Sequence, residues 1–188
     1  QSLCYKGKVQ PGQRVLINGA GGGVGTFAVQ IAKAFGAEVT GVDRTEKLDL
    51  MRSVGADHVI DYTQGDYTKT GQHYDRIVDV AATRSVADYA GTLSPGGVFV
   101  MVGGSSSLVY KLLFLGSWVS ITTRKKMGLL MHKANEGLPV MTEFFETGRV
   151  VPVIDRRYPL TEVSEALRYF GEGRARGKVL ITLQDVII

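Results

Sequence analysis

A glycine-rich segment near the start of the chain constrains the fold more than any other feature of the sequence. Residues 15–25 are VLINGAGGGVG, and five of the chain's 24 glycines lie between Gly19 and Gly25. The β-branched run before the glycines predicts a buried strand, and the apolar residues after them follow the spacing of one helix face. These residues are Val24, Ala28, Ile31, Ala32 and Phe35. A strand, a glycine turn and a helix in direct succession are typical of a dinucleotide-binding unit.

The chemistry of this turn favours a binding site for a pyrophosphate group. Glycine permits tight backbone torsions, and a backbone without side chains lets an anion reach the unpaired N–H groups at the start of the helix. In a G-x-G-x-x-G frame, Ala20 replaces the first glycine and Gly22 and Gly25 follow, whereas Gly19 provides an alternative frame. The competing interpretation is a turn that only packs the helix on the strand. An acidic residue, Asp43, lies 18 residues after Gly25 and favours the binding site.

Short apolar runs alternate with helical patterns over the first two thirds of the chain. Further strands are predicted at residues 38–43, 58–60, 76–80, 98–102 and 118–122, and further helices at residues 48–54 and 135–148. These apolar runs are continuous, as in strands that are covered on both faces. Strand and helix in alternation indicate a parallel sheet with right-handed crossovers. We therefore predict an α/β fold with a Rossmann-type, doubly wound parallel sheet of six strands.

The last part of the chain has a different pattern. Residues 150–160 are predicted to be extended and hold two prolines, and residues 178–183 predict a final strand. Between them, Thr161 is placed to cap a helix whose apolar residues are Val163, Ala166, Leu167 and Phe170. This C-terminal β-α-β segment is expected to belong to another layer or to another domain.

Composition excludes several other classes of protein. An apolar fraction of 44% and a charged fraction of 21% exclude global disorder. The single cysteine, Cys4, excludes an intramolecular disulfide and a cysteine-rich zinc site. The longest apolar stretch, residues 108–121, is interrupted by Lys111 and is shorter than the ~18 residues of a membrane span. The net charge is +4 with Lys and Arg spread along the chain, so we expect neither a nucleic acid nor a membrane partner. The single cysteine and an opening segment that does not resemble a secretory signal favour a cytoplasmic protein.

Four segments resemble, in order and spacing, the zinc-independent quinone oxidoreductase branch of the medium-chain dehydrogenase/reductase superfamily. They are GKVQPGQRVLINGAGGGVGTFAVQIAKAFGAEVTGV (7–42), SVGADHVIDYT (53–63), LSPGGVFVMVGG (93–104) and GRARGKVLITL (173–183). The resemblance implies reduction of a quinone, or of the C=C bond of an α,β-unsaturated carbonyl, by hydride transfer from NAD(P)H. It implies no zinc, and it assigns no catalytic residue. The cofactor would carry the chemistry, and the protein would bind and orient the reactants.

The resemblance also assigns contacts to the parts of the cofactor. The residues that match the pyrophosphate loop are Gly22, Gly23, Val24 and Gly25. Those that match the surroundings of the adenosine 2′-phosphate are Lys47, Tyr62 and either Arg174 or Arg176. Those that match loops near the nicotinamide ribose are Ala81, Val102, Gly103 and Gly104.

The preference between NADPH and NADH depends on opposing signals at the end of the second predicted strand. Asp43 would accept hydrogen bonds from the ribose hydroxyls and repel a 2′-phosphate, which favours NAD(H). Arg44 and Lys47 would bind that phosphate, although basic residues at a helix start are also common without any ligand. Because three positions match the resemblance and one opposes it, we expect NADP(H) rather than NAD(H).

Enzymes of this branch begin with a GroES-like catalytic domain, and the resemblance finds no part of that domain ahead of Gln1. We expect residues 1–150 to form the NAD(P)-binding Rossmann domain and residues 151–188 to be a remnant that would complete the missing catalytic domain. This remnant is expected to expose apolar side chains at Val163, Leu167, Val179 and Ile181.

Three functions remain open at this point. The first is the NAD(P)H-binding domain of an oxidoreductase with a small-molecule substrate, inactive without its catalytic domain. The second is a non-enzymatic nucleotide-binding or interaction module, and the third is another cofactor enzyme, such as a methyltransferase. Because members of the family often pair along the sixth strand, we also expect a homodimer through residues 118–122.

Overall fold

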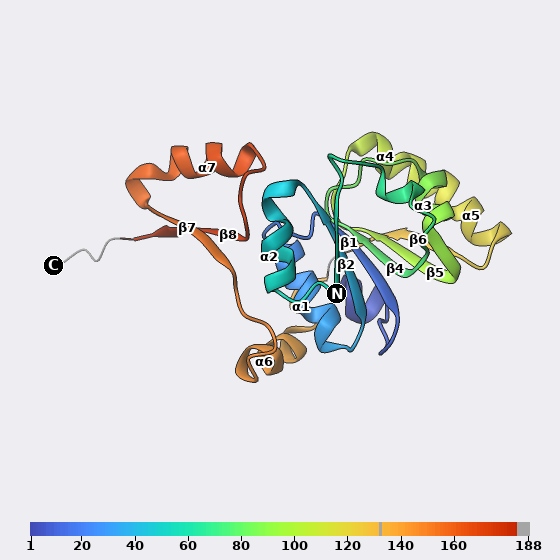
Figure 1. The fold of residues 1–188 in the computed structure, drawn as a ribbon, viewed down its shortest axis with the longest axis horizontal. Coiled ribbons are helices and arrows are strands. Elements are labelled where there is room, and N and C mark those ends of the chain that lie inside the picture. Colours follow the sequence, from blue (N-terminus) through green and yellow to red (C-terminus); the bar gives the residue numbers. More distant parts are fainter. Residues whose placement is uncertain (132, 184–188) are drawn as a thin grey trace.

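A parallel sheet of six strands forms the larger part of the computed structural model, which describes residues 1–131 and 133–183 (Figure 1). Its strands are β1 (Arg14–Asn18), β2 (Glu38–Asp43), β3 (His58–Asp61), β4 (Tyr74–Asp79), β5 (Leu93–Met101) and β6 (Lys126–Leu129). They lie in the order β3-β2-β1-β4-β5-β6, and every neighbouring pair is parallel. This order confirms the predicted Rossmann-type sheet, in which the direction of winding reverses between β1 and β4.

Helices cover both faces of the sheet. They are α1 (Gly25–Ala34), α2 (Leu48–Ser53), α3 (Val86–Thr92), α4 (Ser106–Lys111) and α5 (Ser117–Thr122), with a π-helical turn (Leu112–Gly116) between the last two. Successive residues of a strand point to opposite faces. Val15 and Ile17 of β1 therefore pack with α1 and α2, whereas Leu16 packs with α3, α4 and Phe99 of β5. Burial on both faces explains the continuous apolar runs of the strands.

One predicted strand is wrong, because residues 118–122 are helical and the sixth strand is β6. α4, the π-helical turn and α5 form one continuous helix after β5. Its buried residues recur every four positions, at Leu108, Leu112 and Gly116, which is a helical period. The Ser120 hydroxyl also donates to the Gly116 carbonyl (2.7 Å) within this helix. The sheet edge on which a homodimer is expected therefore lies at β6, not at residues 118–122.

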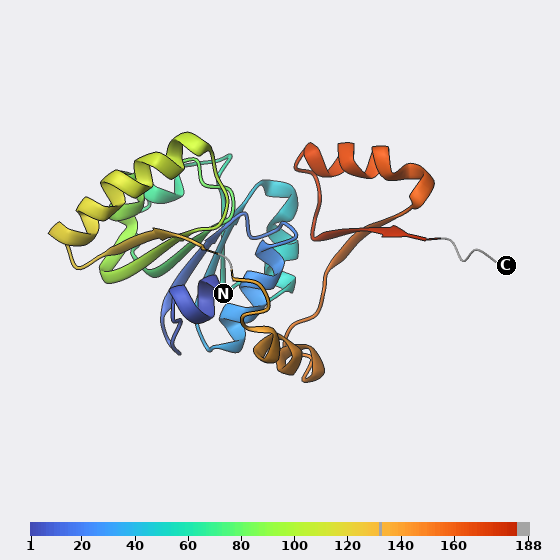
Figure 2. The same cartoon turned by 180° about the vertical axis from the view of Figure 1, so that it is seen from behind.

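The C-terminal segment forms a smaller unit beside α1 and α2, as both views of the ribbon show (Figures 1 and 2). Its elements are α6 (Leu138–Glu146), β7 (Ile154–Pro159), α7 (Val163–Gly171) and β8 (Lys178–Thr182). β7 and β8 are parallel, which confirms the predicted strand–helix–strand order. The expected Thr161 cap is absent, because a 3-10 turn at Leu160–Glu162 shifts the helix start to Val163. Leu167 and Ile181 are exposed as expected, whereas Val163 and Val179 are half-buried.

Contacts with α1 fix the position of this C-terminal segment. The rings of Phe35 and Phe144 meet edge to face with centroids 5.5 Å apart. The Gln30 side chain on α1 then makes two hydrogen bonds with the backbone of Val151, one donated to its carbonyl (3.0 Å) and one accepted from its N–H (2.8 Å). These contacts hold the chain that leads into β7 against the helix that follows the glycine turn.

Candidate functional site

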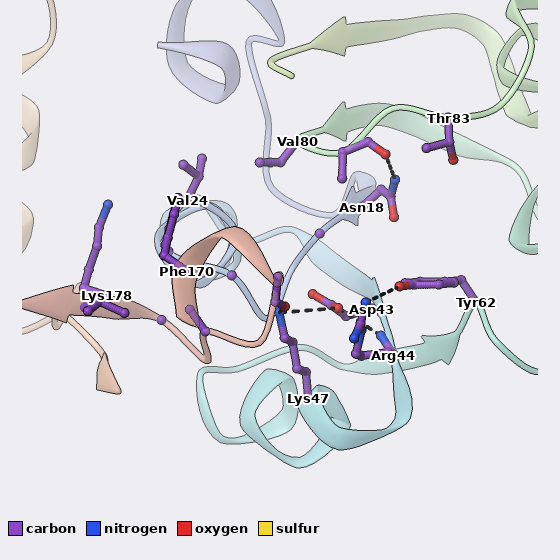
Figure 3. A pocket seen from close by; sticks show the side chains of 18 of the residues that line it. Asn18, Val24, Asp43, Arg44, Lys47, Tyr62, Val80, Thr83, Phe170 and Lys178 are labelled. Atoms are coloured by element: carbon purple, nitrogen blue, oxygen red, sulfur yellow. Dashed lines mark hydrogen bonds and ion pairs between the residues drawn. The ribbon is translucent and has the colours of Figure 1, made fainter. Parts of the chain in front are cut away.

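A cavity of about 710 Å³ opens at the carboxyl ends of β1, β2 and β4, where the strand order reverses (Figure 3). In open α/β sheets, ligands bind at such a switch point. Gly22, Gly23 and Val24 of the glycine turn line one side of the cavity. Phe170 and Lys178 of the C-terminal segment lie on the same side as Val24, as Figure 3 shows, and a Cβ at Gly23 would lie 3.3 Å from the Lys178 Cδ. The two units of the chain therefore enclose the cavity together.

Three of the five glycines of the turn have separate geometric roles. Gly19 has a φ of +77°, a left-handed torsion that favours glycine. Gly25 packs so closely that a Cβ would lie 2.5 Å from the Ala20 Cα and against the Gly19 carbonyl oxygen. At Gly22, a Cβ would meet only the Gly19 carbonyl oxygen, at 3.5 Å, and Gly22 itself lines the cavity. The turn is thus closely packed on its protein side and open at Gly22.

The start of α1 offers backbone donors beside the cavity. The N–H groups of Gly23 and Val24 make no hydrogen bond with any residue in the described ranges. α1 is ten residues long, and its aligned peptide dipoles place a partial positive charge at this end. Free N–H groups and a helix dipole together form a site for an anion such as a phosphate.

Asp43, at the end of β2, holds the glycine turn in place. Its side chain is 7% exposed, and one carboxylate oxygen accepts a hydrogen bond from the Gly21 N–H (2.9 Å). The other oxygen accepts from the Arg44 N–H (2.9 Å) and lies 3.9 Å from the Lys47 ammonium. The carboxylate therefore has protein partners on both of its oxygens and fastens the turn to β2.

Lys47 connects the two units of the chain across the cavity. Its side chain is buried, and its Nζ donates to the Gly173 carbonyl (3.0 Å) in the loop after α7. Arg44 lies nearby, where its Nη2 donates to the Tyr62 hydroxyl (3.3 Å), and this hydrogen bond raises the pKa of Arg44 above its usual value. Lys47 and Tyr62, which the resemblance assigned to the 2′-phosphate, thus line the same cavity as Arg44, and Figure 3 labels all three.

A second cavity of about 420 Å³ is lined by basic residues from distant parts of the sequence and by two acidic residues, Glu46 and Asp155. Arg174 and Arg176 both line it, together with Arg44 and Lys47. The sequence left open which of Arg174 and Arg176 belongs here, and the structure places both at this cavity. A further arginine, Arg156 of β7, also lines it.

Arg156 is a candidate that sequence reasoning missed. Its guanidinium lies 4.2 Å from the centre of the Tyr169 ring, and that of Arg174 lies 5.4 Å from the same ring. The Asp155 carboxylate accepts hydrogen bonds from the Tyr169 hydroxyl (2.7 Å) and the Arg176 N–H (2.8 Å). The stacking depends on the packing of α7 against β7, so no local pattern in the sequence indicates it.

A buried polar cluster supports the loop after β4, and sequence reasoning missed it as well. The Asn18 amide donates to the Asp79 carboxylate (2.8 Å) and to the Ala81 carbonyl (3.2 Å). The Ala81 N–H donates to the same carboxylate oxygen (3.0 Å), and the Tyr67 hydroxyl donates to the other (3.4 Å). Burial raises the pKa of Asp79 above its ordinary value. The available signal was an acid directly after the apolar pair Ile77 and Val78 of a buried strand, because a buried acid requires polar partners.

The residues expected near the nicotinamide ribose occupy different places. Ala81 lines the large cavity, but Val102, Gly103 and Gly104 do not. These three follow β5 and pair with the loop after β4, where the Gly103 carbonyl accepts from the Ala82 N–H (3.0 Å). They therefore support the loop that carries Ala81 without lining the cavity themselves.

Known proteins share this architecture. A family model described as zinc-binding dehydrogenase matches residues 54–181. The chain belongs to the zinc-binding dehydrogenase family. It is 34% identical over 195 residues to a zinc-type alcohol dehydrogenase-like protein of Schizosaccharomyces pombe, covering 95% of this chain and 54% of that protein.

Two further relatives of this chain are an NAD(P)H oxidoreductase and an enoyl reductase. The mitochondrial NAD(P)H oxidoreductase RTN4IP1 of Mus musculus is 32% identical over 194 residues, with 92% of this chain and 48% of that protein covered. The trans-enoyl reductase pgmF of Aspergillus terreus is 30% identical over 198 residues, with 98% and 56% covered. The chain spans about half the length of the curated relatives it matches.

Solved structures give the same result for the fold. An NAD-dependent alcohol dehydrogenase is 27% identical, with a TM-score of 0.82, and the match covers 98% of this chain and 55% of that one. The quinone oxidoreductase of Coxiella burnetii is 22% identical, with a TM-score of 0.80 over 95% of this chain and 55% of that one, and shows the fold alone.

Within residues 1–131 and 133–183, no three His, Cys, Asp or Glu side chains group closely enough to hold a metal ion, so these residues do not fit a zinc site.

Proposed function

We propose that this chain forms the NAD(P)H-binding part of an oxidoreductase that reduces a quinone or an α,β-unsaturated carbonyl. The observation that carries the proposal is the cavity at the switch point, which the glycine turn and the start of α1 line. Its volume of about 710 Å³ is typical of small-molecule and cofactor sites. The reaction class is supported by the relatives, which include an NAD(P)H oxidoreductase and an enoyl reductase.

The glycine turn would hold the pyrophosphate of the cofactor. The free N–H groups of Gly23 and Val24 supply donors, and the absence of a side chain at Gly22 leaves room for the phosphates to approach the backbone. Asp43 and Gly25 would act indirectly, because they fix the shape of the turn.

The second cavity would hold the 2′-phosphate of NADPH. Arg44, Arg156, Arg174 and Arg176 line it, and guanidinium groups bind phosphate oxygens through charge-assisted hydrogen bonds. Asp43, the one residue that opposed NADPH, has protein partners on both oxygens and is 5% exposed. These two observations favour NADP(H) over NAD(H).

A bound nicotinamide would supply a hydride for the substrate. The loop after β4 would position that end of the cofactor, because Ala81 lines the cavity and its N–H is fixed by the buried Asp79. Phe170 and Lys178 line the cavity beside the glycine turn and would limit the entry of water there. In this proposal, residues 1–150 hold the pyrophosphate and the nicotinamide. The segment from residue 151 onward closes the cofactor cavity and supplies three of the four arginines for the 2′-phosphate.

Isothermal titration calorimetry of the 188-residue chain with NADPH and NADH tests the proposal. We expect both to bind and NADPH to bind more tightly. R174Q and R176Q should each lower the affinity for NADPH by about 10- to 100-fold, because a hydrogen bond to a charged group contributes about 1.5–3 kcal/mol. NADH should be unaffected by either change.

R149Q is the matched control, because Arg149 is exposed and lines neither the cavity at the switch point nor the second cavity. It should bind both cofactors as the unchanged chain does. The absence of heat from both cofactors would overturn the proposal. An equal loss of affinity for NADH and NADPH in R174Q and R176Q would overturn the placement of the 2′-phosphate.

A further inference from the structure

The continuous helix formed by α4, the π-helical turn and α5 exposes large apolar side chains along its outer side. Tyr110 and Trp118 are 65% exposed, Phe114 is 76% exposed and Ile121 is 83% exposed. Their spacing of three to four residues aligns them on one face of the helix. Leu113, 52% exposed, lies on the same face. We call these five residues the outer stripe.

The outer stripe is not a poorly packed core, because the opposite side of the helix is firmly packed. Leu108 and Leu112 are buried against the sheet. At Gly116 a Cβ would lie 3.3 Å from the Met127 Cβ, so the helix backbone approaches β6 closely. The Ser120 hydroxyl accepts a hydrogen bond from the Met127 N–H (3.1 Å). The sheet therefore fixes this helix with the outer stripe facing solvent.

The sequence around the outer stripe carries only positive charge. The 47 residues from Tyr89 to Asn135 contain no Asp or Glu, although the whole chain has 18 acidic residues. The same segment holds five Lys or Arg residues. Lys111, Arg124 and Lys126 are exposed on the helix and directly after it. An aromatic and aliphatic surface is thus bordered by basic side chains without an acidic partner nearby in sequence.

We propose that the outer stripe docks this protein on the surface of a lipid bilayer that contains anionic headgroups. Apolar and aromatic side chains of a surface-lying helix enter the boundary between headgroups and acyl chains, and Lys and Arg bind the lipid phosphates. The helix would lie on the bilayer rather than cross it. Among the helices of the described ranges, none is long and apolar enough to cross a membrane.

Charge favours a lipid surface over a second copy of this chain. A two-fold symmetric interface brings the same patch of both copies together. The basic residues beside the outer stripe would then face one another without acidic partners from this segment, and like charges in contact oppose association. The outer stripe is also accessible, because α4 and α5 lie on the side of the molecule opposite α7 and β8 in both views (Figures 1 and 2).

Trp118 provides a direct test, because it is the only tryptophan of the chain and belongs to the outer stripe. The 188-residue chain is mixed with vesicles of phosphatidylcholine, with or without phosphatidylglycerol, and Trp emission and co-sedimentation are measured. With phosphatidylglycerol, the emission should shift to shorter wavelength and should be quenched by lipids brominated on their acyl chains. F114S and I121S should each lower the partition coefficient by about tenfold, because each removes a large apolar side chain.

Two control variants separate the outer stripe from general effects. L167S changes an equally exposed residue (65%) on α7 and should bind vesicles as the unchanged chain does. R124E/K126E should lose the binding to anionic vesicles, whereas R149E/R157E, with the same net charge, should largely retain it. Far-UV circular dichroism and the thermal midpoint verify that each variant is folded.

Three results would overturn the membrane proposal or a part of it. Unchanged Trp118 emission and no co-sedimentation with anionic vesicles would overturn the proposal. Equal binding to vesicles with and without phosphatidylglycerol would overturn the assignment to an anionic surface. A Trp118 emission that is already shifted in buffer, varies with protein concentration and ignores vesicles would assign the outer stripe to a second copy instead.

Discussion

Alanine at Gly22 and alanine at Gly25 should have opposite effects, although the two positions lie in the same turn. At Gly25, the added Cβ would lie 2.5 Å from the Ala20 Cα and against the Gly19 carbonyl oxygen. Both are backbone atoms, which cannot move without disturbing β1. At Gly22, the nearest atom would be the Gly19 carbonyl oxygen at 3.5 Å, which is an ordinary van der Waals distance.

The expected magnitudes follow from these contacts. Overpacking a well-packed region costs about 1–3 kcal/mol, and rigid backbone around Gly25 puts G25A at the upper end. G22A introduces no such clash, and Gly22 does not have a positive φ. Restricting the unfolded chain then stabilises the protein by about 0.4–1 kcal/mol. The free energies of unfolding of the two variants should therefore differ by about 3 kcal/mol.

Urea unfolding followed by circular dichroism measures this difference, and calorimetry with NADPH measures binding. G22A should unfold at or above the urea concentration of the unchanged chain, yet bind NADPH about tenfold or more weakly, because its methyl group takes space needed by the pyrophosphate. Equal stability of G22A and G25A would refute the packing argument. Unchanged NADPH binding by G22A would refute the position assigned to the pyrophosphate.

Two further predictions concern stability. Because burial raises the Asp79 pKa, the stability from its protonation is complete below the ordinary carboxyl pKa of about 3.9 and is lost as the pH rises through the raised value. D79N should flatten that part of the pH profile of urea unfolding, and an unchanged profile would contradict this role. F99A should cost about 3–5 kcal/mol, since Phe99 is 1% exposed, and F114A less than about 0.5 kcal/mol. Similar losses in urea unfolding would show that the exposed face of the α4–α5 helix is wrongly assigned.

The sheet and the glycine turn could be predicted because their signals are local. Buried parallel strands require continuous apolar residues, and runs such as Val15, Leu16 and Ile17 supply them. The turn depends on torsions and close contacts within a few residues, such as the positive φ of Gly19 and the packing of Gly25. Residue type alone therefore indicates this part of the structure.

The prediction of a strand at residues 118–122 is wrong because apolar residues occupy both sides of the α4–α5 helix. Leu108 and Leu112 face the sheet, whereas Phe114 and Trp118 face solvent. A helical period is visible only where apolar and polar faces alternate, and that contrast is missing here. The exposed apolar residues that obscure the helical pattern are also the outer stripe, which is unusual for a solvent-exposed surface.

Residue type alone does not decide between NADPH and NADH, because the preference depends on which partners Asp43 and the basic residues have in the folded chain. Asp43 carries the charge expected of an NADH site, yet its oxygens accept hydrogen bonds from the Gly21 and Arg44 N–H groups. Arg174 reaches the second cavity through the packing of α7, 130 residues further along the chain than Arg44. A carboxylate with protein donors on both oxygens has fewer positions left for a ribose. The arginines have protein partners as well, such as Glu172 for Arg174 (3.0 Å), but a guanidinium has five N–H donors and keeps others for a phosphate. Cofactor preference in this fold therefore depends on tertiary contacts as much as on the residue at the end of β2.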